Sequence, residues 1–288
     1  LMMLRLILKP LEDLALFIGS RDWTRRLARC ALRPFKLKKD IRIRVGEDSL
    51  YVSSIDRLAA ALLWKHSLLS GLEARIYRER VKPGMTVLEI GANIGFFTLL
   101  FSKLAGAAGK VIAFEPDPGN FRLLEKCVSA NGMKNTLCVR KAVSDRTGDG
   151  LLFRSEEHHG DHRIFASADG RESVKIETAA IDDFLPAGER VDFIKMDIQG
   201  AEYSALLGME TAILRSAPLT MLCEFSPGML RTAGADPAEF LKKLLALGFT
   251  LKYLDGRTDT AKAASPEELL GLCPGNKYLN LLLEKAAL

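Results

Sequence analysis

The chain has 288 residues, of which 48% are hydrophobic and 27% are charged. These proportions are ordinary for a globular protein and exclude the collagen-like, low-complexity and disulfide-scaffold classes. The five cysteines are widely spaced and none forms a C-x-x-C motif, which argues against a disulfide framework and a thiolate zinc site. We therefore expect a globular protein of the reducing cytoplasm.

The net charge of +5 is unevenly distributed along the chain. Residues 1–44 hold 12 Lys or Arg and 4 Asp or Glu, a balance of +8, so the other 244 residues carry 5 − 8 = −3. A slightly acidic core argues against nucleic acid as a partner. We divide the chain into a basic, apolar N-terminal extension (residues 1–70) and a main domain (residues 71–288).

The first 39 residues of this extension mix basic residues with apolar ones. Arg5 and Lys9 interrupt the apolar run before about 20 residues, too early for a transmembrane helix. The run also lacks the small-residue cleavage site of a secretory signal. Two interpretations stay open for residues 1–39: a helical appendage packed on the main domain, or a peripheral contact with an anionic membrane.

Beyond residue 40, short apolar runs alternate with helical patterns. A hairpin is predicted at 41–45 and 49–53, followed by helices within 56–80 that are broken near residue 70. Strands are then expected at 85–90, 110–114, 136–143, 191–197, 219–225 and 277–283, and helices at 94–105, 118–130, 201–214 and 236–247. Strands that are apolar on both faces and separated by helices form a parallel sheet covered on both sides. The fold class is therefore α/β, with an insertion at 149–180 that consists of two strands around a polar loop.

A cofactor site is predicted where the first two strands of this sheet end. Gly91 and Gly95 flank a strand-to-helix turn whose backbone N–H groups can hold an anion. Glu115 ends the next strand twenty residues after Gly95, at the spacing where an acid accepts hydrogen bonds from ribose hydroxyls. Ligands of open α/β sheets bind at the carboxyl ends of the strands, so these two strand ends predict a nucleoside site.

Asn93 indicates which nucleoside is bound. A dinucleotide site has the pattern G-x-G-x-x-G, but here Asn93 replaces the middle glycine and Phe96 or Phe97 replaces the third, so a pyrophosphate would meet side chains. S-adenosylmethionine has no phosphates, and its amino-acid groups can be met by Glu89, the Asn93 amide and the backbone. We therefore favour S-adenosylmethionine over NAD, with Ser144 or Asp145 reading the adenine edge. The residues expected to bind it are Glu89, Gly91, Ala92, Asn93, Gly95, Phe96, Glu115, Pro116, Ala142, Ser144 and Asp145.

Between about residues 70 and 255 the sequence resembles the FkbM-type S-adenosylmethionine-dependent methyltransferases. The motifs that carry the resemblance are VKPGMTVLEIGANIGFFTLLFSKL, VIAFEPDPGNFRLL, NGMKNTLCVRKAVSDRTG, GDHRI, VDFIKMDIQGAE and CEFSP, in this order. The resemblance implies a class I Rossmann-like, seven-stranded sheet with its last strand antiparallel. It also implies methylation of a hydroxyl on a sugar, polyketide or related metabolite. Gln199 departs from the pattern, because many relatives have glutamate there.

Two further strand ends carry residues suited to chemistry. Lys195 and Asp197 share a strand face, because side chains in a strand repeat every two residues. An acid in an otherwise apolar strand is costly to bury without a partner, so we expect Asp197 to line the site near the methyl group. Glu224 ends the following strand and is interpreted in the same way. Glu202 keeps two explanations, a site residue or an acid that offsets a helix dipole.

Three of the four histidines, His158, His159 and His162, lie within five residues of the polar loop, beside Asp161 and Arg163. Metal ligation, an active-site lid and a solvated loop all stay open, and no metal is predicted because the ligand set is incomplete. His162 is the preferred proton acceptor, because histidine titrates near neutrality. Asp161 and Arg163 would orient it or bind substrate, and Asp197 is the rival base.

These observations together predict a cytoplasmic S-adenosylmethionine-dependent O-methyltransferase. The expected partner is a small-molecule hydroxyl acceptor such as a sugar, a polyketide or a lipid-linked compound. Two alternatives stay open: N-methylation of a small molecule, and a nucleoside-binding module without catalysis. The sequence leaves the acceptor, the metal requirement and the oligomeric state undetermined.

Overall fold

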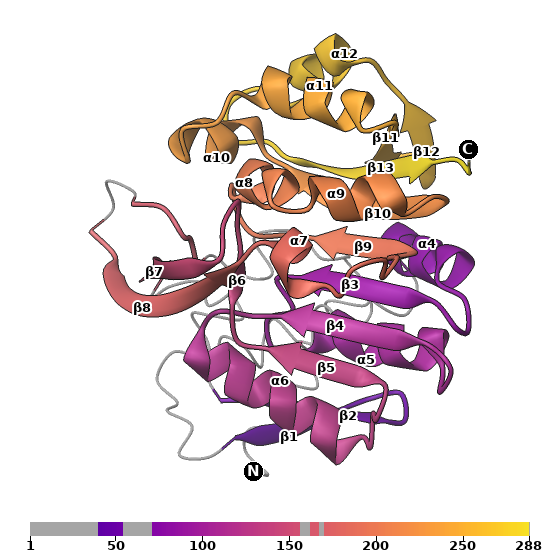
Figure 1. Cartoon of the computed structure of the whole chain (residues 1–288), viewed down its shortest axis with the longest axis vertical. Coiled ribbons are helices and arrows are strands. Elements are labelled where there is room, and N and C mark those ends of the chain that lie inside the picture. The colour runs from indigo at the N-terminus through magenta and orange to yellow at the C-terminus, as the bar shows by residue number, and fades with distance from the viewer. Residues whose placement is uncertain (1–39, 54–70, 156–161, 167–169, 288) are drawn as a thin grey trace.

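The computed structural model describes residues 40–53, 71–155, 162–166 and 170–287. Its centre is an eight-stranded sheet with the order β12-β11-β13-β10-β9-β3-β4-β5 (Figure 1). In chain order the strands of this sheet are β3 (Thr86–Ile90), β4 (Lys110–Phe114), β5 (Thr136–Val139), β9 (Phe193–Met196), β10 (Leu219–Phe225), β11 (Thr250–Asp255), β12 (Thr260–Ala263) and β13 (Leu279–Lys285).

Most of the sheet is parallel, as predicted. The neighbouring strands β10, β9, β3, β4 and β5 all run in one direction. The last strand, β13, lies between β10 and β11 and is antiparallel to both. The predicted α/β sheet with an antiparallel last strand is confirmed, and β12 extends the seven expected strands at one edge by pairing with β11.

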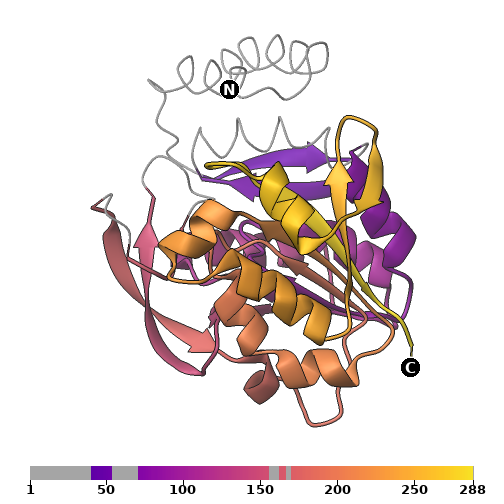
Figure 2. The same ribbon diagram turned by 90° about the horizontal axis from the view of Figure 1, so that it is seen from above.

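Helices cover both faces of the sheet. Successive side chains of the central strands point to opposite faces, and both faces are apolar, so each face packs against its own set of helices. Val87 and Phe193 pack in one buried cluster with residues of α4 and α5, whereas their chain neighbours Leu88 and Ile194 pack in another with residues of α8, α9 and α11. Figure 2 shows the purple α4 and the orange α11 on opposite sides of the sheet. The helices are α4 (Leu72–Arg80), α5 (Phe96–Ala105), α6 (Pro118–Ala130), α7 (Ile181–Phe184), α8 (Glu202–Leu207), α9 (Glu210–Arg215), α10 (Pro227–Thr232), α11 (Pro237–Ala246) and α12 (Pro266–Leu272).

The insertion between β5 and α7 forms a separate small sheet. Strands β7 (Gly148–Arg154) and β8 (Glu172–Ala179) pair antiparallel, and β6 (Ala142–Val143) pairs parallel with β8. The two strands predicted around a polar loop are confirmed. This sheet lies on the side to which the arrowheads of β3, β4, β5 and β9 point (Figure 1). The insertion therefore stands beside the carboxyl ends of the central strands.

Two elements expected to be continuous are divided. The strand predicted at 136–143 splits into β5 and β6, because the segment between them contains an exposed residue, Arg140, and β6 leaves the main sheet to pair with β8. The helix predicted at 201–214 is broken at Gly208. A Cβ there would lie 1.9 Å from the carbonyl oxygen of Ser144, so the break lets two backbone segments approach closely.

The predicted hairpin is present and packs on the main domain. Strands β1 (Ile41–Val45) and β2 (Asp48–Val52) pair antiparallel. Leu50 is fully buried in a cluster that includes Leu123 of α6, and Asp40 forms ion pairs with Arg122 and Lys126 on the same helix. The hairpin therefore shares a buried cluster with α5 and α6 of the main domain, although its residues were assigned to the N-terminal extension.

Two other predictions about the extension lie outside the described residues. These are the basic segment 1–39 and most of the helices predicted at 56–80, whose described part is α4. Among the helices of the described ranges, none has the length and hydropathy of a membrane span.

Candidate active site

A pocket opens at the carboxyl edge of the sheet, where the central strands meet the insertion. Its lining comes from the ends of β3, β4 and β9, from α6, and from the insertion. The lining residues are Ile90, Gly91, Asn93, Phe114, Glu115, Pro116, Asn120, Lys141, Ala142, Val143, Leu152, His162, Ile164, Asp197, Ile198, Gln199 and Ala201.

The turn after β3 brings bare backbone to this pocket. Gly91 has a φ of 85°, and a Cβ there would lie 2.2 Å from the carbonyl oxygen of Asp197. Only glycine fits a position with this φ and this close approach. Asn93 also has a positive φ, 53°, a conformation that asparagine tolerates better than most residues. The turn thus holds its backbone N–H groups in a tight loop before α5.

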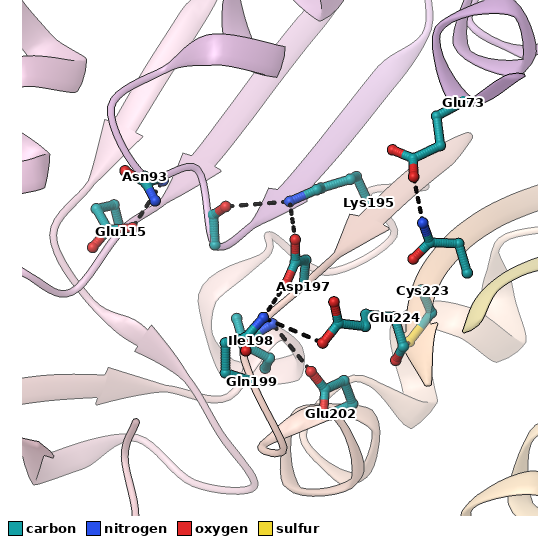
Figure 3. Close-up of polar contacts among 12 residues, drawn as sticks. Glu73, Asn93, Glu115, Lys195, Asp197, Ile198, Gln199, Glu202, Cys223 and Glu224 are labelled. Atoms are coloured by element: carbon teal, nitrogen blue, oxygen red, sulfur yellow. Dashed lines mark hydrogen bonds and ion pairs between the residues drawn. The ribbon is translucent and has the colours of Figure 1, made fainter. Parts of the chain in front are cut away.

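Glu115, directly after β4, accepts hydrogen bonds from several groups around the pocket. Its Oε2 accepts a hydrogen bond from the backbone N–H of Asn93 at 2.8 Å. Its Oε1 accepts from the backbone N–H of Asp117 at 3.0 Å and lies 3.4 Å from Nδ2 of Asn120. Burial raises the pKa of Glu115 to about 7, although these hydrogen bonds act to lower it. The carboxylate therefore links the turn after β3, through the contact with Asn93 drawn in Figure 3, to the start of α6.

Glu89 and Lys195 lie beneath this turn, on the sheet face that α5 covers. Glu89 is fully buried, and its Oε2 accepts a 2.6 Å hydrogen bond from the hydroxyl of Thr98. Its other oxygen, Oε1, is buried and has no hydrogen-bond partner among the described residues. Burial raises the pKa of Glu89 to about 7, and the nearby ammonium of Lys195 only partly offsets this. Glu89 is not among the lining residues, and its unpartnered Oε1 lies beneath the turn that carries Gly91 and Asn93.

Lys195 lies within a group of carboxylates. Its Nζ is 3.5 Å from Oδ2 of Asp197, 3.4 Å from the carbonyl oxygen of Gly91 and over the ring of Phe97. Burial acts to lower the pKa of Lys195, but Asp197 and Glu89 outweigh it and the pKa is raised. Lys195 therefore stays charged and holds Asp197 beside the pocket.

Asp197 and Glu224 share one partner at the ends of β9 and β10. Nε2 of Gln199 donates to Oδ1 of Asp197 at 2.9 Å and to Oε1 of Glu224 at 3.2 Å (Figure 3). Burial, followed by the charges of Asp197 and Glu202, raises the pKa of Glu224 well above its usual range. Asp197 is 38% exposed at its side chain and lines the pocket. The strand ends thus supply one accessible carboxylate held by an amide and an ammonium.

Glu202 stabilises the turn between β9 and α8. Its two carboxylate oxygens accept hydrogen bonds from the backbone N–H groups of Ile198, at 3.1 Å, and Gly200, at 2.9 Å. Gln199 and Gly200 both have positive φ in this turn. Glu202 therefore acts on the site indirectly. It does not line the pocket, but it fixes the backbone of the turn that presents Gln199.

The predicted cofactor residues do not all reach the pocket. Gly91, Asn93, Glu115, Pro116 and Ala142 line it, whereas Ala92, Gly95 and Phe96 do not. Ser144 and Asp145 do not line it either, so the predicted reading of the adenine edge by these side chains is not supported. Both bond to the hydroxyl of Ser204 on α8, because β6 turns away from the pocket after Val143.

The predicted catalytic residues are also divided. His162 and Asp197 line the pocket, Lys195 and Glu224 lie behind Asp197, and Arg163 pairs through its backbone with Phe153. His158, His159 and Asp161 lie outside the described residues. Within the described ranges, no three His, Cys, Asp or Glu side chains are grouped as a metal site.

Several pocket residues were not singled out from the sequence. Asn120 lies one helical turn into α6, where a hydrophilic residue is unremarkable, and its only signal was its place five residues after Glu115. Leu152 and Ile164 are ordinary apolar residues of the insertion, and Lys141 lies in a charged turn. Glu73 of α4 lies near the same group of acids. It accepts a hydrogen bond from Asn280 of β13, and Asn280 is the residue opposite Glu224 in the β10–β13 strand pair. Its position is set entirely by tertiary packing.

Comparison with known proteins identifies the family. A family model described as the methyltransferase FkbM domain matches residues 89–251, more than half of the chain. The chain belongs to the FkbM methyltransferase family. The resemblance stated from the sequence motifs is confirmed, and the cofactor of this FkbM methyltransferase fold is S-adenosylmethionine.

Two curated proteins illustrate the relationship. The chain is 29% identical over 155 residues to 2-O-methyltransferase NoeI of Sinorhizobium fredii, a match that covers 47% of this chain and 61% of that protein. It is 23% identical over 145 residues to Methyltransferase 1 of Beauveria bassiana, covering 43% of this chain and 58% of that protein. The chain thus spans about three fifths of the length of the curated relatives it matches.

Solved structures give a looser match. A SAM dependent methyltransferase from Aquifex aeolicus is 18% identical, with 76% of this chain and 91% of that chain covered and a TM-score of 0.43. Aeropyrum pernix fibrillarin with natively bound S-adenosyl-L-methionine is 13% identical, with 88% and 85% covered and a TM-score of 0.45. We assign the fold of this FkbM methyltransferase from its own strand order.

The residues of the FkbM methyltransferase site fit S-adenosylmethionine. The buried, unpaired Oε1 of Glu89 is an acceptor suited to an ammonium group. Oε2 of Glu115 accepts one bond from Asn93 and keeps a second lone pair for a ribose hydroxyl. The turn at Gly91 has room only for backbone, because a Cβ there would meet the carbonyl oxygen of Asp197, so the ends of β3 and β9 lie close together beside the pocket.

Proposed function

We propose that this chain transfers a methyl group from S-adenosylmethionine to a hydroxyl of a small-molecule acceptor, with Asp197 as the proton acceptor. The observation that carries the proposal is the position of Asp197. Its carboxylate lines the pocket at the end of β9, is partly exposed, and is held by Lys195 and Gln199. An oriented carboxylate beside a methyl donor suits deprotonation of an attacking hydroxyl.

The chain's own groups have distinct tasks in this reaction. Bound S-adenosylmethionine supplies an electrophilic methyl group on its sulfonium. Asp197 accepts the proton that the acceptor hydroxyl loses, and the ammonium of Lys195, 3.5 Å away, orients that carboxylate. Glu224 stays protonated near neutral pH because its pKa is raised by burial, so it accepts the hydrogen bond from Gln199 without placing a second negative charge beside Asp197.

Asp197 is preferred here over His162, the first choice from the sequence. Nδ1 of His162 accepts a hydrogen bond from the backbone N–H of Ser155 at 3.1 Å, which occupies the lone pair of that nitrogen. Asp197 ends a strand of the central sheet and needs no change of loop position to act as a base. A hydroxyl acceptor is also in keeping with NoeI, which is named a 2-O-methyltransferase.

The acceptor class of the proposal is a sugar, a polyketide, a lipid-linked compound or a related metabolite. The experiment is incubation with methyl-labelled S-adenosylmethionine and fractions of a cell extract, with the labelled product identified by mass and its methyl linkage by fragmentation. Label on oxygen supports the proposal, and label on nitrogen contradicts it. Cofactor binding with no label transfer to any fraction would instead indicate a nucleoside-binding module.

An Asp197→Asn variant then tests the assigned base. We expect it to lower kcat by roughly 10² to 10⁴, because a general base of this kind contributes that much, while cofactor affinity stays within a few fold. Asp149→Asn, which changes an exposed carboxylate on β7, is the matched control and should retain wild-type kcat. A wild-type kcat in Asp197→Asn would contradict the assignment.

The location of the protein is part of the same proposal. We place it in the cytoplasm, because the described cysteines, Cys127, Cys138, Cys223 and Cys273, are free thiols. We also propose a peripheral contact between residues 1–39 and an anionic membrane, on the basis of their excess of basic residues. Co-sedimentation that requires acidic lipid and falls with rising salt would support this contact.

A further inference from the structure

We infer that the acceptor presents a vicinal diol, two hydroxyls on neighbouring carbons, and that Gln199 is the residue that selects it. One hydroxyl gives its proton to Asp197 and is methylated, while the second donates a hydrogen bond to the side-chain oxygen of Gln199. The inference rests on the proposed function and narrows its acceptor to a neutral polyol, of which a sugar ring is one form.

Gln199 lies in a backbone conformation that needs support. Its φ is 56°, in a region that residues other than glycine rarely adopt. Glu202 holds this turn by accepting hydrogen bonds from the N–H groups on either side of Gln199, those of Ile198 and Gly200. Strain of this kind is typical of functional sites, and Gln199 lines the pocket. The turn therefore serves to present the Gln199 side chain.

The amide of Gln199 has a defined orientation. Its Nε2 group donates to Oδ1 of Asp197 and to Oε1 of Glu224, so both of its hydrogens are engaged (Figure 3). Because both partners are carboxyl groups, the nitrogen of the amide faces them and the oxygen faces away. Within the described residues no group donates to Oε1 of Gln199, and this oxygen is not buried. The oxygen is thus an available hydrogen-bond acceptor of a pocket-lining residue.

Asp197 is the second hydrogen-bond acceptor at this end of the pocket. Its side chain is 38% exposed and lines the pocket two residues before Gln199. Its oxygens meet one amide N–H and one ammonium, but a carboxylate has about four lone-pair positions, so others stay available. Asp197 and Gln199 thus offer neighbouring oxygens, which a diol with its two O–H donors satisfies together.

The donors near these oxygens are already engaged. The N–H groups of Ile198 and Gly200, which at the start of a helix could hold an anion, are taken by Glu202. The side chain of Lys195 is only 7% exposed, and its ammonium lies 3.5 Å from Asp197. The turn after β9 therefore offers oxygens to a ligand, which favours a substrate that supplies the hydrogens.

The charge at this end of the pocket disfavours an anionic acceptor. Burial raises the pKa of Glu224, and three further carboxyl groups raise it more, those of Asp197, Glu202 and Glu73. The ammonium of Lys195 acts in the opposite direction but only partly offsets them. A phosphate or carboxylate beside the reacting hydroxyl would be repelled by these acids, whereas neutral hydroxyls are not. The diol therefore belongs to an uncharged part of the acceptor.

Periodate tests for the diol before the acceptor is known, because it oxidatively cleaves the carbon–carbon bond between two neighbouring hydroxyls. Fractions of a cell extract are treated with periodate, or with iodate as the control, then desalted and incubated with the full chain and methyl-labelled S-adenosylmethionine. We expect periodate to abolish labelling of the active fraction and iodate to leave it unchanged. Fragmentation of the labelled product should place the methyl ether next to a carbon that carries a free hydroxyl.

Two variants test Gln199 with the active fraction as the acceptor. Gln199→Glu keeps an oxygen at the same chain length but has no N–H for Asp197, so it should lower kcat and leave the apparent KM of the fraction within about threefold. Gln199→Asn, which tolerates the positive φ, withdraws the oxygen by one carbon and should raise this KM about tenfold. Both should bind S-adenosylhomocysteine as the wild type does in calorimetry. Asp149→Asn, at an exposed position on β7, is the matched control.

The diol inference and the proposed function fail in different ways. If no untreated fraction is labelled, the proposed function fails and the inference fails with it. If oxygen is labelled but labelling survives periodate, or if the methylated oxygen has no hydroxyl on a neighbouring carbon, only the diol inference fails. Equal apparent KM values for Gln199→Glu and Gln199→Asn would remove Gln199 from acceptor recognition. If circular dichroism shows that Gln199→Asn is misfolded, Gln199→Gly replaces it, because glycine adopts positive φ freely.

Discussion

Glu89, Glu115 and Glu202 are fully buried around one pocket, and each meets a different group. Glu115 receives backbone N–H groups from the turn after β3 and the start of α6. Glu89 receives a hydroxyl and keeps one oxygen available, while Glu202 receives two backbone N–H groups of the turn before α8. Burial raises the pKa of all three to about 7. The cofactor site is thus assembled from desolvated acids that differ in their partners.

Glu115→Ala should weaken binding of S-adenosylmethionine by about 1–3 kcal/mol, the cost of leaving buried polar groups without a partner. The loss has two sources: the ribose hydroxyls lose their acceptor, and the N–H groups of Asn93 and Asp117 lose theirs. Titration calorimetry measures the effect, and Glu125→Ala, an exposed position on α6, serves as the control. Wild-type affinity in a folded Glu115→Ala chain would remove Glu115 from the ribose site.

Individual site residues could be predicted from the sequence where they lie at the end of a predicted strand. Gly91, Glu115 and Asp197 could be predicted because the end of a parallel strand fixes where the next side chain lies. Ser144 met the same criterion but points to Ser204, since β6 pairs with the insertion and not with β4. Whether a strand end faces the pocket depends on which strand it pairs with, and a single sequence does not specify that pairing.

The turn between β9 and α8 is the element on which the acceptor end of the site depends. It presents Gln199, at a positive φ, to both Asp197 and Glu224. A Cβ at Gly200 would lie 2.8 Å from the carbonyl oxygen of Met229 in α10, so the turn also packs closely on α10. The conformation is costly by itself and persists because Glu202 satisfies its backbone.

Glu202→Ala should lower the free energy of unfolding by about 2–4 kcal/mol, because it leaves the N–H groups of Ile198 and Gly200 unpaired in a buried turn. Glu239→Ala provides the matched control. Glu239 is also in the first turn of a helix, α11, but its side chain is exposed, so its loss should cost less than about 1 kcal/mol. Urea unfolding of both variants gives the comparison, and equal losses would reduce Glu202 to a helix-dipole effect.

At the element scale, hydropathy patterns located the central strands and most helices but missed the far edge of the sheet. Strands β11 and β12 were not predicted because Thr250–Asp255 and Thr260–Ala263 are largely exposed or half-buried and rich in polar residues. Their pairing depends on β13, which is nearby only in the folded chain. Long apolar strands are predictable from their own residues, whereas edge strands depend on their neighbours.

Over the whole molecule, the charged residues fall into two groups: the buried glutamates around the site, and ion pairs that join elements elsewhere. Asp40 with Arg122 and Lys126 joins the β1–β2 hairpin to α6, and Arg75 with Asp259 joins α4 to the segment between β11 and β12. These pairs are exposed or partly exposed and contribute little individually. The buried glutamates, in contrast, make folding sensitive to pH near neutrality.

Stability should fall as pH rises from about 4.5 to 7. Glu89, Glu115 and Glu202 have pKa values near 7 in the folded chain and near 4.5 when unfolded, so in this window the folded state binds more protons. The slope of the unfolding free energy with pH is then negative, and each carboxyl contributes up to about 1.4 kcal/mol per pH unit. The nearby Lys195 ammonium reduces this at Glu89.

Urea unfolding at pH 5 and at pH 7.5 tests the slope. We expect stability to be lower at pH 7.5 by several kcal/mol, within the limit of about 8 kcal/mol that three carboxyls set over the two units up to pH 7. Carboxyls with lowered pKa, Asp40 and Asp255, titrate below this window and do not oppose the trend. Glu89→Gln retains a side-chain oxygen for Thr98 but cannot ionise, so its decrease should be smaller than that of the wild type. Stability that is constant or rises between these pH values would mean that the three glutamates are already ionised in the folded chain at pH 5.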